Sequence, residues 1–141
     1  MGLQYYHINT LPRLRQIVWC RLPEGADLKP GSTVRPVLVR ASKRHTETGR
    51  GALLVAYGTT RLDTGNRGSI DLIIQNVERL TTLDLPHAVR FDLGRENWLP
   101  WAAEFFSPPE HNPYVVAGDL NDREIVRLRR CLKRRGIITA L

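Results

Sequence analysis

Arg35 is one of two residues in this 141-residue chain whose placement suits phosphate chemistry. It precedes Pro36, and proline restricts the residue before it to an extended conformation, so the guanidinium is held at the entrance of a strand. A fixed arginine can grip phosphate with two parallel hydrogen bonds and can stabilise charge on a pentacoordinate phosphorus transition state. A single Arg-Pro pair is also compatible with a surface arginine in a turn.

Thr59 is the second candidate. It follows the apolar segment 52–57 and lies beside Gly58, which lets a ligand approach the backbone. Its hydroxyl can orient a ribose or a phosphate through one hydrogen bond, whereas the alternative is a turn-capping threonine. Arg35 and Thr59 end adjacent predicted strands, so we expect them to face each other across one end of a barrel.

Short strands separated by turn signals must position these residues. β-Branched, aromatic and alternating apolar residues predict strands at 17–21, 36–40, 52–57, 70–74 and 88–93. Glycine, proline and polar residues predict connections at 22–34, 41–50 and 63–68. The segment 52–57 is apolar on both faces, so we expect it to lie centrally in the sheet.

The segment 88–93 alternates apolar and polar residues. We expect Arg90 and Asp92 to face solvent and the intervening apolar residues to face the core. A cluster of aromatic residues follows, and core packing is favoured for it over a groove that binds a partner. Its members are Trp98, Trp101, Phe105 and Phe106.

A helix is predicted near the C-terminus. Asn121 and Glu124 have capping-box spacing, and Gly136 is a natural stop. An apolar stripe follows at helical spacing, formed by Ile125, Leu128 and Leu132. Seven basic residues lie between positions 123 and 135; a solvated face is favoured for them over RNA contact. The predicted fold is α+β and mostly β, a small barrel with a C-terminal helix.

The composition is that of a soluble globular protein, with 42% apolar and 25% charged residues. The net charge of +7 indicates contact with nucleic acid or an acidic protein segment, although a solvated basic surface is the alternative. No apolar run is long enough to span a membrane, and export is not indicated. Two distant cysteines and four scattered histidines predict neither a metal site nor a cofactor, and a reduced cytoplasmic protein is expected.

The order and spacing of several segments resemble the MazF/PemK toxins of bacterial type II toxin–antitoxin systems. The matching segments are IVWCRLPEG at 17–25, RPVLV at 35–39, LLVAYGTTRL at 53–62, VRFDL at 89–93 and LPW at 99–101. The resemblance covers roughly residues 15–135, so 1–14 is interpreted as an N-terminal extension and 15–141 as one barrel domain.

This resemblance implies an SH3-like barrel that forms a homodimer. It also implies an endoribonuclease toxin that cuts single-stranded mRNA without metal and is neutralised by a cognate antitoxin. The family's catalytic arginine falls on Arg35 and its catalytic threonine or serine on Thr59. Attack by the ribose 2′-hydroxyl would leave a 2′,3′-cyclic phosphate.

Four further residues are assigned to RNA contact on this resemblance. Lys29 would lie near backbone phosphates, and Thr60 and Arg61 directly follow the catalytic threonine. Trp19 can stack on a base or belong to the core, and Arg61 can equally be a solvated arginine.

The chain departs from the family pattern at residues 15–16, 28–31 and Gly58. Two alternatives therefore stay open. One is a non-catalytic member of the fold that binds nucleic acid or protein, for example a gyrase poison like the CcdB toxins. The other is a plain interaction module.

Overall fold

The structure is a computed structural model that describes residues 2–62 and 70–136. The connection predicted at 63–68 lies outside these ranges. The strands of the chain are β1 (Gln16–Arg21), β2 (Val34–His45), β3 (Arg50–Thr59), β4 (Leu72–Ile74), β5 (Val89–Pro100) and β6 (Val116–Asp119). Its helices are the short 3-10 helix η1 (Ile8–Thr10), α1 (Val77–Thr82) and α2 (Asp122–Arg134).

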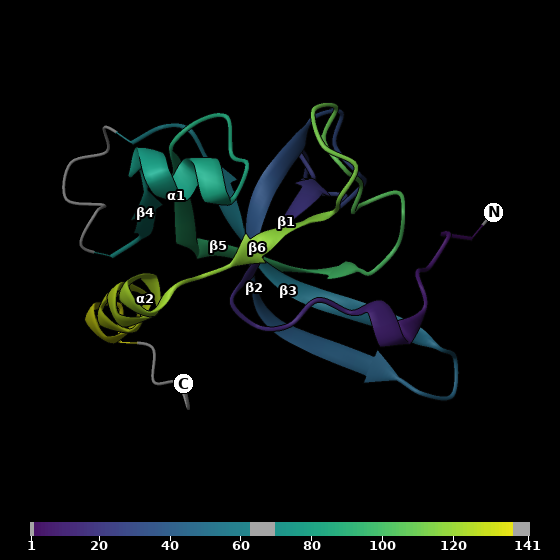
Figure 1. Cartoon of the computed structure of the whole chain (residues 1–141). Coiled ribbons are helices and arrows are strands. Elements are labelled where there is room, and N and C mark those ends of the chain that lie inside the picture. The colour runs from purple at the N-terminus through teal and green to yellow at the C-terminus, as the bar shows by residue number, and fades with distance from the viewer. Residues whose placement is uncertain (1, 63–69, 137–141) are drawn as a thin grey trace.

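The described strands form one curled antiparallel sheet in the order β4-β5-β3-β2-β1-β6 (Figure 1). This arrangement confirms a mostly β, α+β fold with a C-terminal helix. β3 pairs with β2 on one side and β5 on the other, as expected for its doubly apolar sequence. α1 and α2 lie together beside β4, and the hairpin of β2 and β3 extends in the opposite direction (Figure 1).

The prediction that residues 41–50 form a connection was wrong. β2 and β3 continue pairing through this segment as far as His45 and Arg50, so only residues 46–49 make the turn. Strand pairing is made by the backbone and continues beyond the apolar core, so polar side chains did not reveal it. α1 was not predicted, because six residues are too few to display an apolar period.

Both faces of the sheet are buried, because alternate residues of the strands enter two different cores. On β1, Ile17 packs in the core beneath α2, and Val18 packs in the core on the other face. The N-terminal segment covers this second core: the rings of Tyr6 and Trp101 lie 4.6 Å apart, and Trp101 Nε1 donates to Thr10 Oγ1 at 3.0 Å.

Three members of the aromatic cluster are buried in the second core, as predicted: Trp101, Phe105 and Phe106. The fourth, Trp98, is 37% exposed, and Lys43 Nζ lies 4.1 Å from the centre of its ring. Trp98 lies on β5 next to the buried Leu99, so its side chain points to the opposite, more open face of the sheet.

The capping box of α2 is present, with Glu124 N donating to Asn121 Oδ1 at 2.8 Å and the reverse bond at 2.9 Å. Leu128 and Leu132 are buried beneath the helix, and Gly136 has a positive φ of 78° after it. No helix within residues 2–62 and 70–136 has the length and apolar character needed to cross a membrane.

Candidate functional site

The structure brings Arg35 and Thr59 together at one end of the sheet. The pair Val37 and Tyr57 fixes the antiparallel register of β2 and β3, and extending it by two residues sets Arg35 opposite Thr59. The two backbones approach closely between them. A Cβ atom on Gly58 would lie 2.1 Å from the carbonyl oxygen of Pro36, so only glycine fits there.

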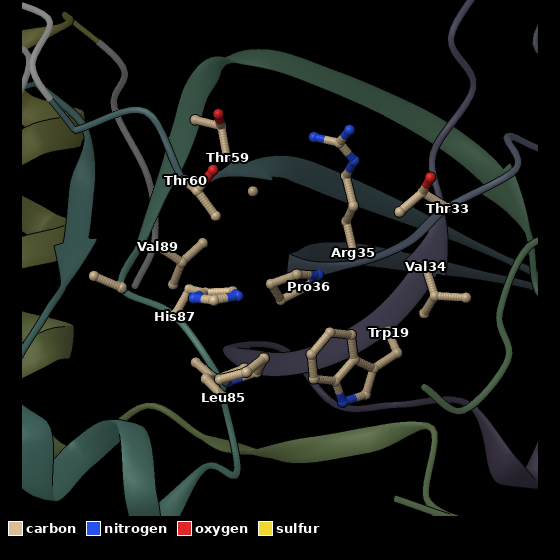
Figure 2. Close-up of a pocket in the computed structure, with 13 residues that line it drawn as sticks. Trp19, Thr33, Val34, Arg35, Pro36, Thr59, Thr60, Leu85, His87 and Val89 are labelled. Atoms are coloured by element: carbon tan, nitrogen blue, oxygen red, sulfur yellow. The ribbon is translucent and has the colours of Figure 1, made fainter. Parts of the chain in front are cut away.

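Arg35 is exposed, and within the described residues its guanidinium makes no hydrogen bond or ion pair. Figure 2 shows this group extended between Thr33 on one side and Thr59 on the other. An uncompensated guanidinium flanked by hydroxyl groups is suited to holding an anionic oxygen.

Thr59 is half-buried, and its hydroxyl accepts a hydrogen bond from the backbone N–H of Arg61 at 3.2 Å. This contact is the turn-capping role expected of a threonine after a strand. Because the N–H uses only an oxygen lone pair, the hydroxyl hydrogen remains available to a ligand. The two roles of Thr59 are therefore compatible.

A first cavity of about 270 Å³ lies on one side of these two residues (Figure 2). Its apolar lining includes Trp19, Val34, Pro36, Leu85 and Val89. Its polar lining includes Thr33, Arg35, Thr59, Thr60 and His87. His87 was not predicted, because it reaches the cavity only when the segment before β5 lies against the start of β2.

A second cavity of about 330 Å³ lies on the other side, and Arg35, Gly58 and Thr59 line both cavities. Most of its other lining is charged: Glu24, Arg61, Arg90, Asp92 and Arg95. The Arg95 guanidinium lies 5.0 Å from the ring centre of Tyr57, another lining residue that sequence reasoning missed. Arg35 and Thr59 thus separate a largely apolar hollow from an arginine-rich one.

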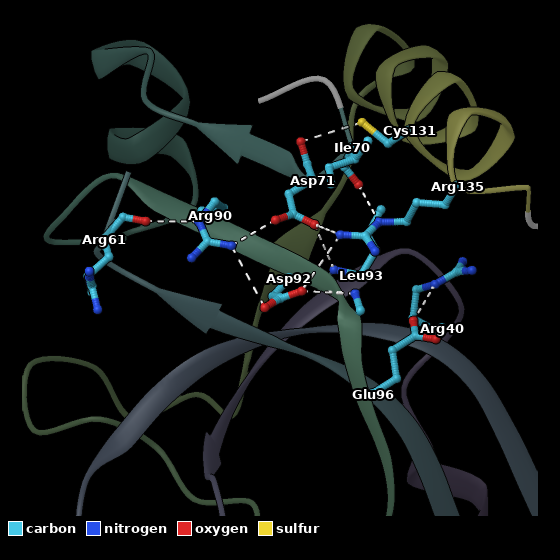
Figure 3. A network of polar contacts seen from close by, with 11 residues as sticks. Arg40, Arg61, Ile70, Asp71, Arg90, Asp92, Leu93, Glu96, Cys131 and Arg135 are labelled. Atoms are coloured by element: carbon cyan, nitrogen blue, oxygen red, sulfur yellow. Dashed lines mark hydrogen bonds and ion pairs between the residues drawn. The ribbon is translucent and has the colours of Figure 1, made fainter. Parts of the chain in front are cut away.

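The prediction that Arg90 faces solvent was wrong (Figure 3). Arg90 is buried; its Nη1 donates to Asp71 Oδ2 at 2.7 Å and its Nε to the carbonyl oxygen of Arg61 at 2.9 Å. Arg135 also donates to Asp71, whose side chain is fully buried. Asp92, which was also expected to face solvent, is half-buried, and its Oδ2 lies 3.8 Å from Arg90 Nη1. A carboxylate placed in the core draws both arginines inward, a contact that no local pattern reveals.

The remaining predicted residues divide into two groups. Thr60 and Arg61 are exposed and line the first and second cavities, respectively. Trp19 is 4% exposed; it lies in the core and contributes only part of the first cavity's wall. Lys29 lines neither cavity; its Nζ lies 3.8 Å from Asp27 Oδ2 in an exposed loop.

No group of three or more histidine, cysteine, aspartate or glutamate residues arranged to hold a metal ion occurs across residues 2–62 and 70–136. No protein-family model matches the chain, and no curated protein matches it.

Proposed function

We propose that this protein is a metal-independent endoribonuclease of the MazF/PemK kind, built on an SH3-like barrel, that cuts single-stranded RNA. One observation carries the proposal: the unpaired guanidinium of Arg35 faces Thr59 across two paired strand ends, between an apolar and an arginine-rich cavity. A scissile phosphate fits between these residues, with an unpaired base on the apolar side and the continuing backbone on the basic side.

The reaction begins when a ribose 2′-hydroxyl attacks the adjacent phosphorus. The bond between phosphorus and the 5′-oxygen breaks, the leaving oxygen takes a proton from water, and the products are a 2′,3′-cyclic phosphate and a 5′-hydroxyl. A guanidinium is a poor proton carrier, so the role of Arg35 is to stabilise the dianionic phosphorane by charge and hydrogen bonds. Thr59 donates its hydroxyl hydrogen to a phosphate oxygen. Among the residues of the first cavity, His87 carries an imidazole, the side chain that most often serves as a general base, and it is the candidate to accept the 2′-hydroxyl proton.

The setting of the enzyme is part of the proposal. A net charge of +7 suits an acidic antitoxin segment as the neutralising partner, and the resemblance implies a homodimer. A cytoplasmic location agrees with the RNA substrate and with two buried cysteines that remain free thiols.

An RNA cleavage assay in excess EDTA tests the proposal. The wild type should cut labelled single-stranded RNA, and Arg35→Ala should lower the rate by about 100-fold or more. Thr59→Ala should lower it by about tenfold or more, the cost of one transition-state hydrogen bond of roughly 1.5 kcal/mol. Arg44→Ala is the matched control, because this arginine is exposed on the same strand as Arg35 but distant from both cavities. Equal rates in all four proteins would exclude the assigned roles.

A non-catalytic binder on the same fold is the second candidate. The hydrogen bond that Thr59 already makes to Arg61 N favours it, since a capping threonine needs no catalytic role. In that case RNA stays intact in every protein tested, and a bound partner depends on Arg35.

A further inference from the structure

α2 carries a large share of the positive charge of the protein. Between Asp122 and Arg134 there are six basic residues and two acidic ones, a difference of +4 within a chain whose net charge is +7. The site at the ends of β2 and β3 does not use any of them.

Three arginines of α2 share one face. Arg123, Arg127 and Arg130 are separated by four and three residues, so at 3.6 residues per turn they fall within a sector of about 60°. All three are exposed. Arg127 donates to the carbonyl oxygen of Ile73 on edge strand β4 at 2.9 Å, which fixes its side chain without neutralising its charge. We call these residues the α2 arginine row.

Glu78 and Asp122 line the same groove as the row, but among the described residues no acid forms an ion pair with it. Glu124 is buried and its carboxylate binds Arg79 twice at 2.8 Å, and the buried carboxylate of Asp71 is bound by other arginines. Within residues 2–62 and 70–136, Arg123 and Arg130 have no hydrogen bond or ion pair. Like charges three or four residues apart on a helix repel each other, so the row weakens the helix that carries it.

The helix dipole does not account for the row either. Cations are favoured in the last turn of a helix, where Lys133 and Arg134 lie. Arg123 lies in the first turn, where the dipole opposes a positive charge. Because the dipole disfavours Arg123 and the three like charges repel one another, the row points to a partner that supplies negative charge.

The row borders hollows that suit a chain of phosphates. Arg123, Arg127 and Arg130 line a groove of about 950 Å³ between α1 and α2, and the last two also line a hollow of about 180 Å³ against β4. The residues that line them include no aromatic side chain, so bases have nothing on which to stack. Side chains of Asn76, Thr82 and Asn121 add neutral hydrogen-bonding groups.

We propose that the α2 arginine row binds the sugar–phosphate backbone of single-stranded RNA, independently of base sequence and outside the cleavage site. The identity of the polyanion as RNA rests on the proposed function. An acidic protein segment is less favoured, because only two apolar residues, Ile74 and Val126, line the groove in which the side chains of such a segment would anchor. Arginine forks match phosphate oxygens bidentately.

Fluorescence anisotropy tests the proposal with a labelled 2′-O-methyl RNA of about 20 nucleotides, which binds but cannot be cut. Affinity is measured from about 50 to about 300 mM potassium chloride for the wild type and for R123Q/R127Q/R130Q. Each phosphate contact contributes about 0.7 to the slope of log affinity against log salt for single strands. The triple variant should therefore lose about 2 from this slope and bind at least tenfold more weakly near 100 mM salt.

The matched control is K43Q/R44Q/R50Q, which removes three exposed cations of the β2–β3 hairpin, away from α2 and both cavities. It should keep most of the slope. R130Q alone, the mildest change, should lose about 0.7. Equal slope losses in the two triple variants would show that RNA responds to the overall positive charge rather than to the row, and would overturn the proposal. Tighter wild-type binding to polyglutamate of the same length than to the RNA would overturn it in favour of an acidic protein.

The binding assay is independent of cleavage, so the two proposals can fail separately. If the wild type cuts no RNA but the row variant still loses its salt slope, the proposed function fails and the row stands. If the wild type cuts RNA while row and control variants bind alike, the row fails and the proposed function stands.

Discussion

Arg90 and Asp71 form an ion pair of 2.7 Å in which the carboxylate side chain is fully buried. The same arginine holds the carbonyl oxygen of Arg61, and the N–H of Arg61 in turn binds the hydroxyl of Thr59. A buried carboxylate thus fixes, through two residues, the turn that carries one half of the candidate site (Figure 3).

Asp71→Asn should strongly destabilise the protein. Asparagine keeps the shape of the side chain but leaves two inward-facing arginines, Arg90 and Arg135, with only the more distant carboxylate of Asp92, 3.8 Å from each, as counter-charge. Breaking a buried pair by removing one partner costs about 3–5 kcal/mol. Urea unfolding followed by circular dichroism would measure the loss of unfolding free energy.

Asp119→Asn is the control for this substitution. Its carboxylate meets Arg13 at 3.5 Å, and both side chains are more than half exposed. Exposed pairs contribute about 0–1 kcal/mol, so this variant should unfold near the wild-type midpoint. Equal losses in the two variants would show that burial of Asp71 does not matter.

Arg35→Ala should separate activity from stability. The side chain is exposed and without a partner among the described residues, so the unfolding free energy should stay within about 0.5 kcal/mol of wild type while cleavage is lost. Arg40→Ala on the same strand should lower the unfolding free energy but leave cleavage by the folded protein intact. Arg40 Nε binds Glu96 at 2.8 Å in a mostly buried ion pair, and neither cavity uses this arginine. Thermal unfolding and the cleavage assay, run on both variants, decide the matter. A large loss of stability in Arg35→Ala would mean that this arginine supports the fold.

Gly58→Ala should distort the site itself. The added Cβ would lie 2.1 Å from the carbonyl oxygen of Pro36, and a backbone atom cannot move aside cheaply. We expect a loss of roughly 1–3 kcal/mol and weaker cleavage, because the strand ends that carry Arg35 and Thr59 must separate. Gly25→Ala is the control, since its Cβ would make only an ordinary contact of 3.4 Å with Asp27. Equal unfolding midpoints for the two variants would contradict the close approach.

The sequence predicted the elements that have a strong local signal. The core parts of β1, β2, β3 and β5 show β-branched or alternating apolar residues, and the capping box of α2 is visible as Asn121 and Glu124. β6 and α1 were missed because four and six residues are too few to show a period. The length of the hairpin was missed because backbone pairing there needs no apolar side chains.

The part of the site that depends on neighbouring strands was predictable from the sequence, and the part that depends on distant contacts was not. Pro36 and the end of an apolar strand were enough to infer that Arg35 and Thr59 lie close together, because each lies two positions beyond Val37 and Tyr57, the last pair of two adjacent strands. His87 and the burial of Arg90 depend on how distant segments pack. Asp71 lies 19 residues from Arg90 in the sequence and 64 from Arg135, so neither contact leaves a local pattern.

The two cysteines should resist alkylation in the native protein, even at alkaline pH. Burial raises the pKa of the Cys20 thiol and of the Cys131 thiol, and only the thiolate reacts. The unfolded thiols ionise near pH 8.5 while the folded ones stay protonated, so the unfolding free energy should fall as pH rises above about 8.5. Mass spectrometry after iodoacetamide treatment at pH 7 and pH 9, with and without urea, measures the alkylation, and urea unfolding curves at the same two pH values measure the change in unfolding free energy. Variants Cys20→Ala and Cys131→Ala assign each adduct. Native labelling that rises tenfold per pH unit would mean that the thiols are accessible.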